Sequence, residues 1–219
     1  MTDRYMVALV LDERPCLVVG GGRVATGKTE NLLACGAQVT VVAPRATRRI
    51  QELSEQGRIG WKKRVFQESD LEGRFLVVAS TDDTELHERI ARMAEERGML
   101  CNIVDVPALC NFTVPAVHRE GPVSVAVSTA GTSPTLAKRL RDLIAAQATG
   151  FGRLAERLGQ ERDWSQRELS DYQQRQRFFE SIVCGDPDPV DLVRRGDMAA
   201  LEELIQTRRR EASQRREDD

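Results

Sequence analysis

Three consecutive glycines, Gly20 to Gly22, constrain the fold of this chain more than any other feature. The apolar, β-branched run from Pro15 to Val19 before them is typical of a buried strand, and residues 24–33 after them have helical periodicity. A strand that ends in glycines and leads directly into a helix is the first unit of many α/β folds that bind phosphate groups. The glycines therefore predict a sheet that carries a nucleotide at one edge.

Strand and helix patterns continue to alternate through the first half of the chain, which predicts an α/β fold with a Rossmann-type parallel sheet. The expected strands cover residues 15–19, 38–43, 58–65, 75–79 and 99–104, and the expected helices cover 24–33, 47–56 and 83–97. After Pro107 the pattern changes to one strand at 123–127 and a helix that begins at Ser133 and Pro134. From about Thr149 the chain is helical and charged, and we expect a charged tail over 207–219 to fray. The predicted parts are a Rossmann domain over residues 1–112, a central segment over 113–148 and a small helical C-terminal domain over 149–219.

Composition excludes several classes of partner. The formal net charge is -2, so no overall positive field attracts nucleic acid or an anionic membrane. The apolar runs are too short to span a bilayer, and the first residues lack the pattern of a signal peptide. The five cysteines are an odd number without a C-x-x-C pair, which indicates reduced thiols in the cytoplasm and no cysteine metal site.

The glycine segment matches two nucleotide-binding motifs at once. Gly20, Gly22 and Ala25 satisfy G-x-G-x-x-[GA], in which the glycines allow a tight turn and close approach of a pyrophosphate. Residues 22–29 also satisfy the P-loop pattern G-x-x-x-x-G-K-[ST], with Lys28 on phosphates and Thr29 on Mg²⁺. The P-loop would leave a short helix and lacks an aspartate directly after the strand at 75–79. The residues alone favour the Rossmann interpretation and leave the P-loop open.

The loops after four strands should converge, because ligands bind at the carboxyl ends of strands in an open α/β sheet. The second strand ends in Pro44 and Arg45 instead of the usual ribose-binding acid, so Arg45 could suit a 2′-phosphate. The next two loops offer Thr81 and Asp82, and then Asn102 with Asp105. Asp105 follows an apolar strand and is a candidate general base, although a turn-capping aspartate has the same pattern.

Several segments together resemble one family in order and spacing. The matching segments are residues 16–25, 77–83, 101–107, 112–116, 121–134 and 136–141. They resemble the precorrin-2 dehydrogenase/sirohydrochlorin ferrochelatase family, which includes the N-terminal module of siroheme synthases. The resemblance covers residues 5 to about 145 closely and the helical remainder only in character. On this resemblance, the P-loop match is a coincidence.

The resemblance implies an enzyme that oxidises precorrin-2 with NAD to sirohydrochlorin and then inserts Fe²⁺ as a passing substrate. It implies a homodimer with residues 113–148 as the dimerisation segment. It places the catalytic aspartate at Asp105 and nucleotide contacts at Arg23, Val24, Pro44 and Arg45. Because family members use NAD without an acidic ribose ligand, it also predicts NAD for this chain.

The tetrapyrrole substrate carries many carboxylates, which basic side chains can bind through charge-assisted hydrogen bonds. The expected substrate contacts are Arg119, Ser128, Lys138 and Arg139. Thr129 stands where some family members carry a phosphorylated serine. We expect His87 to be a surface residue, and His118 is a weaker candidate for substrate contact. Two other functions stay open: a P-loop nucleotide hydrolase, and a module that senses NAD without catalysis.

Overall fold

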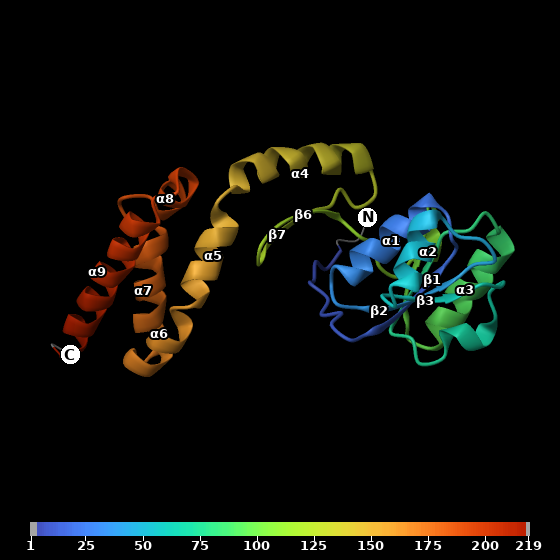
Figure 1. Cartoon of the computed structure of the whole chain (residues 1–219), viewed down its shortest axis with the longest axis horizontal. Helices are drawn as coiled ribbons and strands as arrows, with labels where there is room; N and C mark the ends of the chain where they lie inside the picture. The colour runs from blue at the N-terminus through green and yellow to red at the C-terminus, as the bar shows by residue number, and fades with distance from the viewer. Residues whose placement is uncertain (1–3, 218–219) are drawn as a thin grey trace. The chain divides into compact units, whose positions relative to one another are not determined.

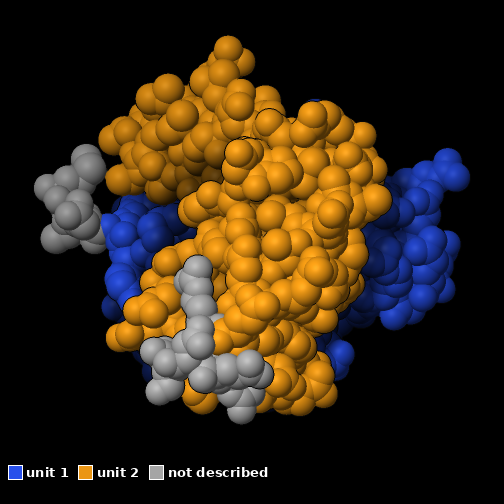
Figure 2. All heavy atoms as spheres, turned by 90° about the vertical axis from the view of Figure 1, so that its left-hand side faces the viewer, with its two compact units in different colours: residues 1–114 blue, residues 115–219 orange. Residues whose placement is uncertain are grey.

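The computed structural model describes residues 4–217 and divides into two compact units, Met1–Val114 and Pro115–Asp219 (Figure 2). Met1, Thr2 and Asp3, where no signal-peptide pattern was found, lie outside the described residues, as do the last two residues of the predicted charged tail. None of the helices in the described part of the chain is both long and apolar enough to cross a lipid bilayer.

Unit 1 contains a five-stranded sheet in the order β3-β2-β1-β4-β5, and every neighbouring pair of strands is parallel (Figure 1). The strands are β1 (Pro15–Val19), β2 (Gln38–Val42), β3 (Gly60–Lys62), β4 (Leu76–Ala79) and β5 (Leu100–Ile103). The helices are α1 (Arg23–Leu33), α2 (Arg48–Glu55) and α3 (Thr84–Glu96), with 3-10 turns η1 (Glu68–Leu71) and η2 (Pro107–Leu109). The predicted Rossmann-type α/β fold is confirmed.

Alternate residues of the strands build two separate cores, one on each face of the sheet. Val18 of β1 packs with residues of α1 and α2, such as Ile50, in the first core. Leu17 and Val19 of the same strand pack with α3 residues, such as Ile90, in the second. Because helices cover both faces, the strands are buried along their length and only the edges can meet a ligand.

The third strand is shorter than the predicted range of residues 58–65. At its start, Gly57 adopts φ +69° and the Arg58 N–H donates to the Leu53 carbonyl, so these residues complete the end of α2. At its other end, the Arg64 N–H donates to the Lys62 carbonyl at 2.8 Å in a tight turn. Helix capping and this turn therefore leave only Gly60–Lys62 for the sheet.

Unit 2 begins with a hairpin of β6 (Ala116–Glu120) and β7 (Val123–Val127), which pair antiparallel, and α4 (Pro134–Ala148) packs against both strands. Gly121, at φ +54°, makes the turn. The sequence analysis missed β6, because its residues Ala-Val-His-Arg-Glu lack the apolar alternation of a half-buried strand.

The remaining helices of unit 2 share one core. They are α5 (Phe151–Gly159), α6 (Arg162–Glu168), α7 (Tyr172–Val183), α8 (Pro189–Arg195) and α9 (Met198–Glu217). The expected fraying from Thr207 is wrong for the described residues, because α9 continues to Glu217. Arg209 of α9 binds the carboxylate of Glu161, which is only 1% exposed and also pairs with Arg157. This buried ion cluster fixes the segment that composition alone marked as a loose tail.

Candidate functional site

The three glycines have three different roles in the turn after β1. Gly20 adopts φ +123°, and a side chain there would lie 2.7 Å from the Ser80 carbonyl oxygen. Gly21 is tighter still, because a Cβ would lie 2.1 Å from the Arg45 carbonyl oxygen. A Cβ at Gly22 would meet no described atom within 4 Å. The sequence analysis missed Gly21, which stands at the variable position of the motif and is required by a contact with a distant loop.

The N-terminus of α1 is open to a ligand. Its N-cap, Gly22, offers no side-chain hydrogen bond, and no acidic residue lies in the first turn. The first backbone N–H groups of the helix therefore lack partners from side-chain caps and carry the positive end of the helix dipole. Ala25 in this turn is fully buried against the sheet. Free donors beside open space at Gly22 fit the diphosphate of a dinucleotide.

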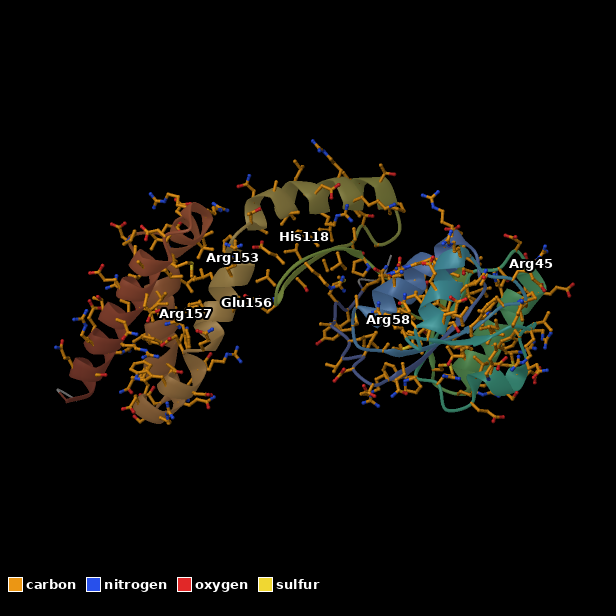
Figure 3. All side chains as sticks on the ribbon, in the orientation of Figure 1. Arg45, Arg58, His118, Arg153, Glu156 and Arg157 are labelled. Carbon is orange, nitrogen blue, oxygen red and sulfur yellow. The ribbon has the colours of Figure 1, made fainter. Side chains whose placement is uncertain are left out.

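The loop between β2 and α2 is bound to the glycine turn. The Thr47 N–H donates to the Gly21 carbonyl at 2.9 Å, and the hydroxyls of Thr26 and Thr47 are 2.7 Å apart. The indole N–H of Trp61 donates to the Ala43 carbonyl at 3.0 Å. These bonds hold the exposed residues Pro44 and Arg45 at the carboxyl edge of the sheet. Figure 3 shows Arg45 at this edge and Arg58, which precedes β3, at the opposite one.

The loop between β4 and α3 contains Thr81, which is half-buried, and Asp82, which is exposed. Asp83 caps α3, as predicted, by accepting from the Leu86 N–H at 2.9 Å. His87 is not the expected surface residue, because only 5% of it is exposed. Its Nε2 lies 3.0 Å from the Thr81 hydroxyl and 3.3 Å from the Thr81 backbone nitrogen. A histidine on a charged helix looks like a surface residue in the sequence, and only the folded loop reveals its partner.

The segment after β5 presents Asp105 to solvent. Asp105 has φ +60°, a left-handed conformation that is uncommon for residues other than glycine, although aspartate and asparagine adopt it more often than most, and that clusters at functional sites. The carboxylate is exposed and receives no hydrogen bond from residues 4–217. Asn102 is buried, and its amide donates to the Phe112 carbonyl at 3.1 Å. The Asn102 side chain therefore joins the end of β5 to the chain near Phe112.

Lys28 and Thr29 do not form a P-loop. Helix α1 begins at Arg23, so both residues lie in its second turn, beyond the free N–H groups. Thr29 is fully buried and cannot hold a magnesium ion in solvent. Burial lowers the pKa of the half-buried Lys28 ammonium, while the nearby Cys110 and Asp105 side chains act in the opposite direction. Lys28 therefore faces the Asp105 segment, and the P-loop interpretation is wrong.

The predicted substrate contacts lie in unit 2. Arg119 is exposed on β6, and Lys138 and Arg139 are exposed on α4. The exposed Ser128 accepts from the Ala130 N–H at 3.2 Å in the loop between β7 and α4. His118 is half-buried on β6 (Figure 3). Within residues 4–217, no three histidine, cysteine or acidic side chains gather in a way that could hold a metal ion.

Three family models match consecutive parts of the chain. A model described as "Putative NAD(P)-binding" matches residues 7–116, about half of the chain. The model of the sirohaem biosynthesis protein central region matches 120–147, and that of the sirohaem synthase dimerisation region matches 150–208. The chain belongs to the siroheme synthase family. The resemblance inferred from the sequence motifs is thereby confirmed.

Curated relatives of this family are longer than the chain. It is 39% identical to a siroheme synthase of Methylobacillus flagellatus over 180 residues, which are 82% of this chain and 38% of that protein. It is 40% identical to a siroheme synthase of Methylococcus capsulatus over 184 residues, which are 84% of this chain and 39% of that protein. The chain thus spans about two fifths of the length of these relatives.

A solved structure matches nearly the whole chain. The structure of SirC, a precorrin-2 dehydrogenase, superposes with a TM-score of 0.75 and 26% identity. The match covers 94% of this chain and 100% of that one. One solved structure that corresponds to this chain in extent is thus of a protein named as a precorrin-2 dehydrogenase.

Proposed function

We propose that this chain oxidises precorrin-2 to sirohydrochlorin with NAD as the cofactor. The observation that carries the proposal is the open, uncapped N-terminus of α1 at Gly22, on the same sheet edge as the strained, exposed Asp105. The full-length match to a precorrin-2 dehydrogenase supports the choice of substrate.

The residues at this edge fit the cofactor. NAD, when bound, supplies the acceptor for a hydride. The free N–H groups of α1 would bind its diphosphate, and the absence of a side chain at Gly22 would let the diphosphate approach the backbone. The residues proposed to hold NAD are Gly20, Gly22, Arg23, Val24, Ala25, Pro44, Arg45, Thr81, Asp82 and Asn102.

Asp105 would accept the proton that leaves with the hydride. Removing two hydrogens from precorrin-2 transfers a hydride to the cofactor and a proton to a base. An exposed carboxylate with no hydrogen bond from the described residues has its oxygens available for that proton. Arg119, Lys138, Arg139 and the Ser128 hydroxyl would bind the substrate's polar periphery, since guanidinium and ammonium groups bind carboxylates strongly.

We also propose that the active form is a homodimer in the cytoplasm. Residues 150–208 match a dimerisation region, and α4 of the preceding segment exposes Leu136, Leu140 and Leu143 along one side. The five cysteines are all free thiols, as expected in a reducing compartment. Iron insertion stays a prediction outside this proposal, because none of the observations on the described residues favours it.

The test is anaerobic incubation of the full chain with precorrin-2 and NAD⁺, followed by the absorbance of NADH and of the oxidised macrocycle. We expect both products to appear together in a one-to-one ratio, and neither without the protein. NAD binding without turnover would instead support a sensing module. Binding of ATP or GTP that requires Mg²⁺ would instead support the alternative function, a P-loop nucleotide hydrolase.

A further inference from the structure

His87 is a buried polar residue whose ring is turned toward the proposed cofactor loop. It lies in the first turns of α3, and its Nε2 is within hydrogen-bond distance of both the hydroxyl and the backbone nitrogen of Thr81. No role for this histidine follows from the dehydrogenation chemistry itself. A buried ring nitrogen with two contacts to one loop residue therefore needs an explanation of its own.

The contacts define the protonation state of the ring. A backbone N–H can only donate, so the bond from Thr81 requires Nε2 to accept and therefore to carry no proton. The Thr81 hydroxyl already accepts from the Asp83 N–H at 3.3 Å, which leaves its own proton free to point at Nε2. These contacts assign Nε2 as the acceptor and therefore place the ring's N–H on Nδ1.

Thr81, which His87 contacts, is connected to the glycine turn through Ser80. Ser80 precedes Thr81, and its carbonyl oxygen is the atom that a side chain at Gly20 would meet at 2.7 Å. The Ser80 N–H is also bound to the Val19 carbonyl at 2.9 Å. A displacement of the Thr81 backbone would therefore be transmitted to the start of the diphosphate-binding turn.

The helix itself does not depend on this contact. Asp83 caps α3, and Ile90, Met93 and Ala94 bury its apolar side in the second core of unit 1. An apolar side chain could fill the space of the ring without loss of the helix. The polar contact thus serves the loop that contains Thr81.

We infer that His87 is a positioning residue that holds Thr81 and the β4–α3 loop in the conformation that binds NAD. This inference rests on the proposed function, since it takes Thr81 as part of the cofactor site. His87 does not contact the reacting atoms and acts only through Thr81.

The first experiment measures NAD affinity by calorimetry on the full chain and two variants. His87→Leu removes the acceptor and leaves the Thr81 N–H unsatisfied, so we expect the Kd for NAD to rise about tenfold. His87→Gln places an amide oxygen near the position of Nε2, and we expect most of the affinity to return. Ile90→Ala is the matched control, because it creates a cavity in the same helix without touching Thr81. It should lower Tm and leave the Kd unchanged.

The second experiment is independent of any variant's folding. His87 and His118 are the two histidines of the chain, so long-range ¹H–¹⁵N spectra of the wild type resolve their tautomers with little overlap. We expect an unprotonated Nε2 on His87 and a change in its shift on titration with NAD. A His87 ring that is protonated on Nε2, or whose shift does not change on titration with NAD, would overturn the inference.

The two proposals fail in distinguishable ways. If the wild type binds NAD and His87→Leu binds it equally well, only the role of His87 is refuted. If the wild type does not bind NAD, the proposed function fails, and this inference fails with it.

Discussion

Two aspartates of unit 1, Asp70 and Asp105, differ in burial and in the hydrogen bonds that their carboxylates accept. Asp70 is buried and receives hydrogen bonds from Lys62, from Arg64 and from the Gln67 N–H. The Arg64 hydrogen bonds above all hold its pKa well below the usual range, although burial acts in the opposite direction. Asp105 is exposed, has a strained backbone and accepts no hydrogen bond from the described residues.

The contrast shows which carboxylate oxygens of unit 1 are available to bind a ligand. The oxygens of Asp70 are committed to the β3–η1 segment, so they have no capacity for a ligand. Those of Asp105 are available at the sheet edge that also contains the free donors of α1. The following variants each add or remove one charged group, and they should separate effects on folding from effects on cofactor binding.

The largest effect should come from a new carboxylate at Gly22. Gly22→Asp places an aspartate at the N-cap of α1, where aspartate is at least as favourable as glycine for the helix. The same charge would occupy the open space for the diphosphate and repel it. We expect NAD affinity to fall by about a thousandfold, the loss of several charge-assisted hydrogen bonds, with Tm unchanged or raised. Calorimetry and thermal unfolding measure the two quantities. Wild-type affinity in this variant would rule out the placement of the cofactor.

Removal of the charge on Asp70 should affect stability instead. Asp70→Asn leaves Lys62 and Arg64 without their anion, and because both are partly exposed they can regain water. We expect a loss of about 3 kcal/mol in the free energy of unfolding, at the lower end for a broken buried pair. Turnover per folded molecule should stay the same. Urea denaturation and a dehydrogenation assay on the same sample measure both.

The same variant has a predicted pH dependence. The folded pKa of Asp70 lies below its unfolded value, so its contribution is present above the unfolded pKa of about 4 and is lost as pH falls below it. The difference in stability between wild type and Asp70→Asn should therefore be full at pH 6 and shrink steadily below pH 4. A difference that is constant across this range would show that folding does not lower the pKa of Asp70.

The smallest effect should follow from Lys28→Ala. Lys28 lies in the second turn of α1, where the helix dipole and free donors no longer act. We expect the Kd for NAD to change by no more than about twofold, because a side chain outside the first turn adds little. Mg²⁺-dependent binding of ATP should be undetectable in both proteins. Loss of all nucleotide binding in Lys28→Ala would restore the P-loop interpretation.

Local sequence patterns predicted the features that depend on neighbouring residues. The turn glycines Gly20 and Gly22, the cap at Asp83 and the start of α4 at Ser133 follow from residues a few positions apart. Gly21 and His87 escaped prediction because their partners, Arg45 and Thr81, meet them only in the folded loops. The end of α9 escaped for the same reason, since Glu161 lies far away in the sequence.

The most direct test of the account is the turnover of Asp105→Asn at saturating NAD⁺ and precorrin-2. The amide keeps the shape of the carboxylate and cannot accept the proton, so kcat should fall by about a hundredfold or more, the usual contribution of a general base. The Kd for NAD and the free energy of unfolding should match the wild type, because the Asp105 carboxylate is exposed and accepts no hydrogen bond from the described residues. A kcat near the wild-type value would contradict the assignment of Asp105 as the base.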